Sequence, residues 1–204
     1  MQDDIFTNYD RNIKRVKNLV KVYDVISSSK SGRKKVVESD ILRSAAVLLH
    51  SSFEDFLRSI LIWKAGSIKK EELDKIPLKG ISNSGRPSKF LLGALKDHEE
   101  ITVKELIIAS VIDYSKFKSF SNIGEVKQAI NLCGFEITEG IEKYSSTIQK
   151  LIQRRHKIVH EADRYDKPGS GNHRIRSISK KNINNWMTAI DMILRELLKQ
   201  MRSS

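Results

Sequence analysis

Cysteine, proline and long hydrophobic runs are all scarce in this 204-residue chain. The single cysteine, Cys133, excludes an internal disulfide and any cysteine-rich zinc site. Only three prolines, together with many good helix formers, favour an all-α fold. No apolar run approaches the roughly 18 residues of a membrane span, and no apolar leader follows Met1. We therefore expect a soluble cytoplasmic protein with no membrane partner.

Positive charge is abundant and unevenly spread. The formal net charge of +12 and the isoelectric point of about 9.7 favour polyanionic partners such as nucleic acid. Between residues 150 and 181, ten lysines or arginines accompany only three acidic residues. More than half of the excess charge thus lies in one stretch, and we expect the strongest attraction for a phosphate backbone there.

Hydrophobic periodicity predicts a succession of helices. The expected helices cover residues 5–28, residues from before 40 to about 65, residues 68–76, 87–96, 102–113, a segment starting at 122, the segment that holds residues 141–160, and a last helix that starts at 179. Residues 102–113 are rich in β-branched side chains and fit a helix or a strand; in a chain that is otherwise helical, a helix is preferred. We expect one domain over residues 1–204, with a core at 38–202 and the N-terminal helix (1–30) appended to it.

The stretch from Leu151 to His160 combines an apolar face with charge. At about 100° per residue, one helical stripe holds Ile141, Tyr144, Ile148, Leu151, Ile152 and Val159. Arg155 falls in the middle of that stripe, and burying an unpaired guanidinium is very costly. It must pair with a hidden acid, extend its charge to solvent, or line a cleft that takes an anion. His156 and His160 lie one turn apart at the edge of the same face, so the stretch predicts a site that holds an anion and moves a proton.

Phosphate in an RNA backbone fits that prediction best. The 2′-hydroxyl of RNA is an internal nucleophile, so cleavage needs only a proton acceptor, a proton donor and a charge that stabilises the transition state. Histidine suits proton transfer because its ordinary pKa is about 6.5. We assign His160 as the acid or base, Arg155 as the phosphate stabiliser and His156 as a helper. No metal or cofactor is expected.

The spacing of these two residues poses a difficulty. Arg155 and His160 are five residues apart, about 140° around a regular helix. They meet only if the helix ends or bends near His160, if the Arg155 side chain curls round, or if a second subunit completes the cleft.

Further residues join the predicted site. Glu54 follows His50 and precedes Arg58 at four-residue steps along the second helix, and it could supply the counter-charge of Arg155; the alternative is an exposed row of ion pairs. The predicted RNA-binding cations are Arg154, Lys157, Arg164, Arg174 and Arg176. The last two, with His173, lie in or beside a loop rich in proline and glycine, which could bind a backbone or be plainly solvated.

The run Arg155-His156-Lys157-Ile158-Val159-His160 resembles the arginine, four residues, histidine signature of HEPN domains. In that family the residue after the arginine is commonly Asn, His or Asp, and here it is His156. The run most resembles the prokaryotic RiboL-PSP-type branch, over roughly Asp40 to Met201. The resemblance implies an all-α, HEPN-like helical bundle with extra short helices and an N-terminal helix. It also implies an acidic or polar residue on the helix that faces the motif, the place that Glu54 would take.

The resemblance further implies a metal-independent endoribonuclease, since many of these proteins resemble toxin or phage-defence ribonucleases. HEPN proteins typically dimerise with both motifs lining one groove, so we expect a homodimer, and an antitoxin is a candidate protein partner. Three alternatives stay open. The chain could be a catalytically inactive RNA-binding or partner-binding HEPN module. His156, His160 and His173 could bind a metal. Finally, His160 could be a core histidine, with Arg155 and Glu54 forming a structural ion pair.

Overall fold

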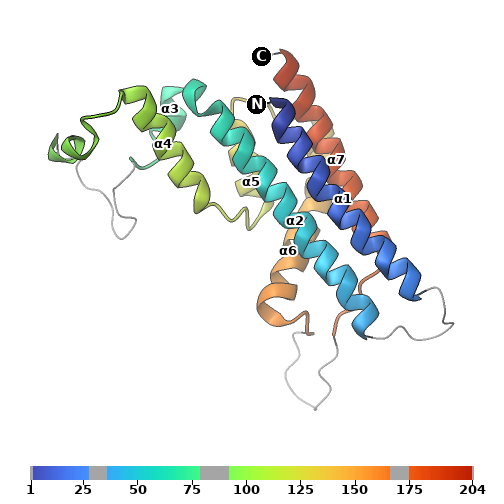
Figure 1. The fold of residues 1–204 in the computed structure, drawn as a ribbon. Coiled ribbons are helices and arrows are strands. Elements are labelled where there is room, and N and C mark those ends of the chain that lie inside the picture. Colours follow the sequence, from blue (N-terminus) through green and yellow to red (C-terminus); the bar gives the residue numbers. More distant parts are fainter. Residues whose placement is uncertain (1, 28–35, 79–91, 166–174, 204) are drawn as a thin grey trace.

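The computed structural model describes residues 2–27, 36–78, 92–165 and 175–203. Within these ranges the chain forms seven α-helices and two short 3-10 helices, and no strand (Figure 1). The α-helices are α1 (Gln2–Ser27), α2 (Val36–Lys64), α3 (Lys70–Leu73), α4 (Val103–Lys116), α5 (Ile123–Leu132), α6 (Glu139–Glu161) and α7 (Lys180–Ser203). The 3-10 helices are η1 (Ala65–Ser67) and η2 (Leu92–His98). The expected all-α helical bundle is therefore confirmed.

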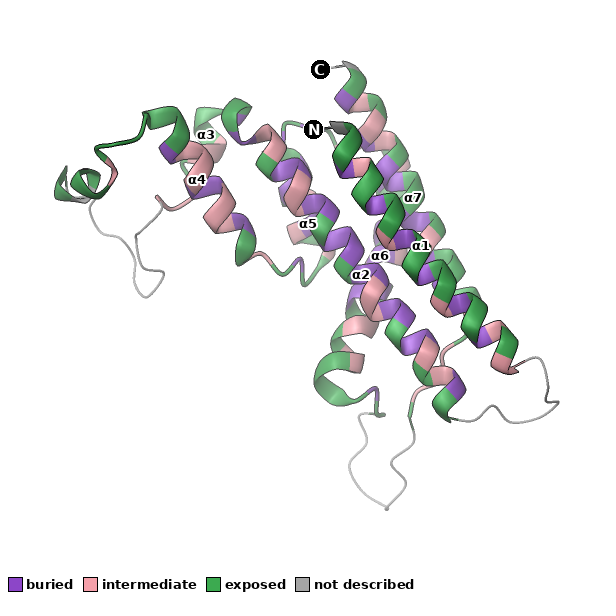
Figure 2. Cartoon of the chain, viewed as in Figure 1, coloured by how far each residue is buried: buried purple, intermediate pink, exposed green. Residues whose placement is uncertain are grey.

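Helix α2 forms the centre of the bundle. Its neighbours α1, α4, α5, α6 and α7 all pack against it, and its buried positions run along almost its whole length (Figure 2). Most of these positions are apolar, such as Leu42, Leu49, Phe53 and Leu57. The same helix also buries Arg43, His50 and Glu54, so charged and titratable groups enter the protein interior from its centre.

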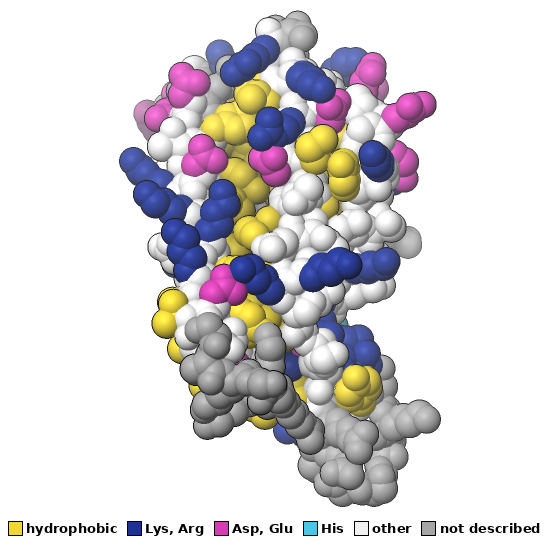
Figure 3. All heavy atoms as spheres, turned by 90° about the vertical axis from the view of Figure 1, so that its right-hand side faces the viewer, with side chains coloured by type: hydrophobic (Ala, Val, Ile, Leu, Met, Phe, Trp, Pro, Cys, Tyr) yellow, Lys and Arg dark blue, Asp and Glu magenta, His cyan; other side chains and the backbone are white. Residues whose placement is uncertain are grey.

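Helix α1 lies along α2 and shares its hydrophobic core. The α1 side of this contact consists of Ile5, Tyr9, Ile13, Val16, Val20 and Tyr23, all buried. The outer face formed by α1 and α7 carries side chains of both charge signs around a hydrophobic strip (Figure 3). Lys180 pairs with Asp24 across the two helices, and Arg195 pairs with Asp191 within α7. Mixed charge of this kind is typical of a solvated surface.

Local signals explain several helix ends. Thr102 and Glu105 form a reciprocal capping box that starts α4, so the ambiguous segment 102–113 is a helix. Asn122 caps α5, and Gly134 follows its end with a φ of 78°, a conformation that glycine adopts without strain. Cys133, at the end of α5, is buried as expected, and burial raises the pKa of its thiol to about 12.

The two predicted short helices differ from the structure. The helix expected over 68–76 is limited to α3, whose four residues stop well before Pro77. The helix expected from Pro87 begins outside the described residues, and the part that is described forms η2. In the part of the chain that the structure describes, no helix is both long enough and apolar enough to cross a lipid bilayer.

Candidate functional site at the end of helix α6

The motif occupies the last two turns of α6, and the helix ends immediately after it. The backbone N–H of Asp163 donates to the carbonyl of Lys157 over 2.8 Å, which closes the helix end. Ala162 and Asp163 both adopt left-handed conformations, with φ of 50° and 56°. For residues other than glycine this conformation costs about 1–2 kcal/mol each. Other interactions must therefore hold the chain in this turn.

The two motif histidines lie on the exposed side of this helix end. Their ring centroids are 4.7 Å apart, so His156 and His160 form one pair of imidazoles. His160 is exposed, and 60% of the His156 side chain is accessible. Glu161 lies close by, 3.9 Å from Nε2 of His156 and 3.6 Å from Nζ of Lys157. Both rings are therefore reachable by a substrate.

Arg155 is half-buried and is directed toward α2. Its positive charge acts on both His50 and Glu54, so the guanidinium lies within electrostatic range of these two buried side chains. No ion pair within 4.0 Å joins Arg155 to Glu54 among the described residues, and its buried Nε has no hydrogen-bond partner there. Glu54 thus approaches Arg155 without neutralising it at close range, and the guanidinium keeps its capacity for an anion.

Helix α2 contributes a cluster of the buried His50 and Glu54 with the partly exposed Arg58. Glu54 Oε1 lies 3.8 Å from Nδ1 of His50, and its Oε2 lies 3.8 Å from Nη2 of Arg58. Arg58 also donates to the carbonyls of Ser115 and Lys118 over 3.2 and 2.6 Å. The predicted alternative of an exposed row of ion pairs is wrong, because His50 and Glu54 are buried.

Burial controls the protonation of this cluster. Burial, together with the charges of Arg155 and Arg58, lowers the pKa of His50 to about 4. The backbone of Phe120 opposes this effect, although neither ring nitrogen of His50 makes a well-formed hydrogen bond to a described residue. Burial also raises the pKa of Glu54, while Arg58 and Arg155 act against the rise. His50 is therefore neutral at physiological pH.

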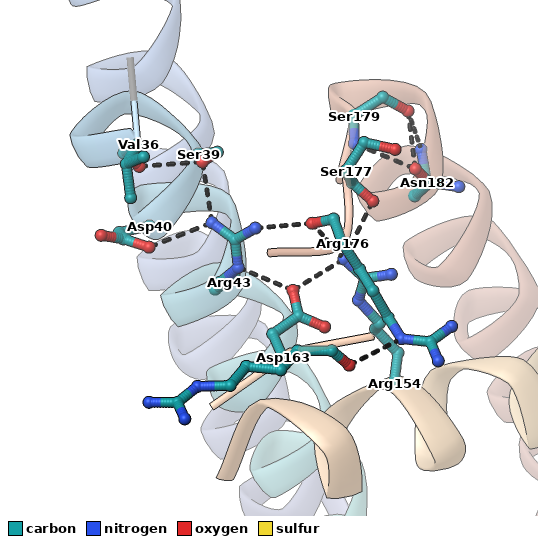
Figure 4. A network of polar contacts seen from close by, with 11 residues as sticks. Val36, Ser39, Asp40, Arg43, Arg154, Asp163, Arg176, Ser177, Ser179 and Asn182 are labelled. Atoms are coloured by element: carbon teal, nitrogen blue, oxygen red, sulfur yellow. Dashed lines mark hydrogen bonds and ion pairs between the residues drawn. The ribbon is translucent and has the colours of Figure 1, made fainter. Parts of the chain in front are cut away.

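Arg154, the neighbour of Arg155, points into a different network (Figure 4). Its Nη2 donates to Oδ2 of Asp163 over 2.8 Å and to the carbonyls of Arg176 and Ser177. Arg43 of α2 donates to the same Asp163 oxygen over 2.7 Å and to the Arg176 carbonyl over 2.6 Å. We call Arg43, Arg154 and Asp163 the Asp163 network. The sequence predicts Arg154 as an RNA contact, but its guanidinium turns inward.

The other predicted RNA-binding cations surround the end of α6. Arg164 is exposed, and its backbone pairs with Ile175 in an isolated β-bridge. Arg176 places its guanidinium over the ring of Tyr165, with 4.9 Å from Cζ to the centroid, and donates to the Arg164 carbonyl. Lys157 is partly exposed beside the histidine pair. His173 and Arg174 lie outside the described residues, and their roles stay predictions.

The structure brings some predicted residues together and separates others. His156 meets His160, and Arg155 meets the buried α2 cluster, but in the described part of the chain no hydrogen bond or ion pair joins Arg155 to His160. The alternative of a core His160 with an Arg155–Glu54 ion pair is wrong, since His160 is exposed and that pair is not formed. No group of three metal-binding side chains gathers among the described residues.

Sequence reasoning missed Arg43 and Asp163. A signal for Arg43 was present, because Arg43, His50 and Glu54 follow one another at steps of seven and four residues and so share one face of α2. This face meets α6, which makes a polar seam between the two helices. Asp163 gave no such signal, since nothing in the sequence shows that an acid after a helix end folds back inside.

The chain matches the model of one protein family. The RiboL-PSP-HEPN family model covers residues 10–203, which is wider than the resemblance seen from the motif and includes most of α1. No curated protein and no solved structure matches the chain. HEPN families suggest nuclease-like or RNA-related modules, consistent with a basic helix end that displays two accessible imidazoles. The chain belongs to the RiboL-PSP-HEPN family.

Proposed function

We propose that the protein is a metal-independent endoribonuclease of HEPN type, and that it acts as a toxin or phage-defence effector. One observation carries this proposal. In a basic region of a HEPN chain, Arg155 forms no ion pair with any described residue and its buried Nε lacks a hydrogen-bond partner among them, while the ring of His160 is accessible five residues further on. A guanidinium without a close counter-ion and a reachable imidazole are the two groups that RNA cleavage requires.

Arg155 would bind the scissile phosphate. Negative charge gathers on the phosphoryl oxygens as the 2′-oxygen attacks phosphorus, and a fixed guanidinium stabilises that charge more strongly than water does. Glu54 and Arg58 position it: the Glu54 carboxyl group attracts the guanidinium from inside the bundle, and Arg58 ties Glu54 to the backbone that follows α4. These contacts make Glu54 a positioning residue in the proposed reaction.

His160 would move the proton. One imidazole nitrogen takes the proton from the 2′-hydroxyl, the 2′-oxygen forms a bond to phosphorus, and the bond between phosphorus and the 5′-oxygen breaks. The leaving oxygen takes up a proton, so the products are a 2′,3′-cyclic phosphate and a 5′-hydroxyl. His156, in ring contact with His160, would orient it or donate to a phosphate oxygen.

A homodimer would complete the site. Arg155 faces α2 while His160 faces solvent, so one chain offers the two groups in different directions. Two copies of the α6 end across a shared groove would let the Arg155 of one chain and the His160 of its partner reach the same phosphate. RNA is the proposed substrate, with Lys157, Arg164, Arg174 and Arg176 as backbone contacts, and an antitoxin protein is a further proposed partner.

The test is RNA cleavage in excess chelator, with His160→Ala as the inactive variant and His98→Ala as the matched histidine control. We expect the wild type and His98→Ala to release fragments with cyclic phosphate ends, and His160→Ala to lose about 10²–10⁴ in rate. Expression in a growing host would show whether cleavage arrests growth, as a toxin or defence effector requires.

Two outcomes would overturn the proposal. Cleavage that stops when metal is removed would contradict a metal-independent reaction. Binding of RNA that weakens steeply with salt but never yields fragments would instead support the second candidate, an inactive RNA-binding HEPN module. The observation that favours this second candidate is that no contact joins Arg155 to His160 within the described chain.

A further inference from the structure

Asp163 connects three parts of the chain that are distant in sequence. Its carboxylate is 1% exposed and accepts from Arg43 of α2 and from Arg154 of α6. Its backbone carbonyl accepts from the N–H of Arg176, in the segment that leads to α7, over 2.8 Å. Arg43 and Arg154 also donate to backbone carbonyls of the same segment, at Arg176 and Ser177. One buried acid and its two arginines thus join α2, the end of α6 and the segment before α7 (Figure 4).

The same residue determines where the motif helix ends. Its N–H closes the last turn of α6 onto the carbonyl of Lys157, and this turn carries His156 and His160. The turn needs left-handed backbone at Ala162 and Asp163, and neither is a glycine. The hydrogen bonds to the carboxylate hold this unfavourable turn in place, and thereby fix the exit of the chain beside His160.

The network also fixes the basic residues next to the motif. Arg164 follows Asp163 directly and pairs with Ile175 through the backbone. Arg176 donates its Nε to the Arg164 carbonyl, while its own carbonyl accepts from both network arginines. A shift of Asp163 would therefore move His160 and these cations together.

We infer that Asp163 is a positioning residue of the nuclease site: its carboxylate, held by Arg43 and Arg154, sets the end of α6 and so places His160 and the cations Arg164 and Arg176 against the RNA. The catalytic part of this inference rests on the proposed function. The positional part concerns this chain alone and can be measured without activity. Arg43 and Arg154 act through Asp163 and are not expected to contact the scissile phosphate.

Three substitutions at Asp163 separate the contributions of its charge, its side-chain shape and its backbone conformation. Asp163→Asn keeps the shape, an acceptor oxygen and tolerance of left-handed backbone; Asp163→Gly keeps only the backbone freedom; Asp163→Ala keeps neither. At a temperature where each variant is folded by circular dichroism, we expect Asp163→Gly and Asp163→Ala to lower kcat on the order of tenfold to a hundredfold, with a smaller change in KM. Asp163→Asn should recover most of that loss.

The second measurement is independent of cleavage. Ring signals of His160 in proton–carbon NMR spectra, and hydrogen exchange of amides 157–161, should change in Asp163→Gly and Asp163→Ala, while the ring signals of His98 stay in place. If none of the chains cuts RNA, the proposed function fails, and these measurements alone decide the positional claim. The positional claim would be overturned if the His160 ring signals and the hydrogen exchange of amides 157–161 stay unchanged. It would also be overturned if the loss of kcat equals the fraction of the variant that is unfolded. Should Asp163→Ala fail to fold, Asp163→Gly and Arg43→Lys are judged by the same criteria.

Discussion

Arg154 and Arg155 are neighbours in sequence, yet they enter two opposite kinds of buried environment. Arg154 donates to one carboxylate oxygen and to two carbonyls. Arg155 lies near a buried carboxyl and a neutral imidazole and forms no ion pair with a described residue. The buried Nε of each arginine lacks a hydrogen-bond partner among the described residues, so the two differ in the ion pair rather than at Nε. The ion-paired arginine therefore holds the structure, and the arginine without an ion pair is available to bind an anion.

The sharpest way to break this comparison is to remove one arginine from the Asp163 network, to which Arg154 belongs. Arg43→Ala leaves Asp163 buried with one arginine, and breaking a buried ion pair in this way typically costs about 3–5 kcal/mol. We expect the free energy of unfolding in urea to fall by that amount. Arg15→Ala, on the exposed face of α1, is the matched control and should change it by less than about 0.5 kcal/mol. Equal effects for the two variants would mean that the network does not stabilise the fold.

Arg155, which forms no ion pair with a described residue, should respond to substitution in activity rather than in stability. Arg155→Gln removes the proposed phosphate stabiliser and should lower kcat on the order of 10²–10³, with little change in the unfolding midpoint. Arg195→Gln, an exposed arginine of α7, serves as its control and should leave both quantities unchanged. Arg154→Gln should show the reverse pattern, a lower unfolding midpoint with any loss of activity following from it. If Arg154→Gln and Arg155→Gln behave alike, the assignment of separate roles is wrong.

The neutral imidazole beside Arg155 makes stability depend on pH. The pKa of His50 is about 4 in the folded chain and 6.5 as its ordinary value, so the unfolded chain binds a proton first as the pH falls. Its effect on stability is therefore absent above about pH 7, grows from pH 6.5 downward, and reaches about 2 kcal/mol of lost stability at pH 5. Below pH 4 the loss no longer grows.

His50→Gln should flatten this dependence in urea titrations at pH 7, 6 and 5. Glu54 acts in the opposite sense, because its raised pKa makes the folded chain take up the proton first. The variant keeps Glu54 and thus isolates the histidine. An unfolding free energy that falls as steeply in His50→Gln as in the wild type would place the titrating group elsewhere.

The smallest expected effect concerns the turn that ends α6. Ala162→Gly relieves a left-handed alanine but adds freedom to the unfolded chain, so we expect a net gain of at most about 1 kcal/mol in thermal or urea unfolding. Gly134→Ala, at the left-handed end of α5, should do the reverse and lower stability by about 1 kcal/mol. A loss of stability in Ala162→Gly would show that the turn is not strained.

The sequence predicts the helices well and the site in part. Periodicity and caps locate the long helices within a few residues, and the motif leads to Arg155, His156 and His160 because a charge on an apolar stripe needs an explanation. Glu54 lies on the flank of the apolar stripe of α2, and the sequence leaves open whether it is buried or exposed. Whether residues 1–204 unfold as one domain stays a prediction, and a single unfolding transition seen by several probes would test it.

The rest depends on tertiary structure. The inward turn of Arg154 is decided by Asp163, and Asp163 is buried only because two left-handed residues fold it back under α2. By side-chain chemistry alone, Arg154 and Arg155 are equally suited to contact RNA. Their difference arises because Arg154 faces Asp163, and Asp163 is itself held by Arg43, more than a hundred residues earlier in the chain.

The backbone bridge between Arg164 and Ile175 has an evolutionary and practical consequence. It joins the two ends of the intervening segment into a stem, and Asp163 anchors this stem by accepting a hydrogen bond from the N–H of Arg176. Residues within that segment can therefore be exchanged, lengthened or shortened while the imidazoles and the guanidinium keep their places. Under the proposed function, a change in this segment would alter what is recognised while the cleavage site stays the same, and grafting a foreign segment onto this stem would test that separation.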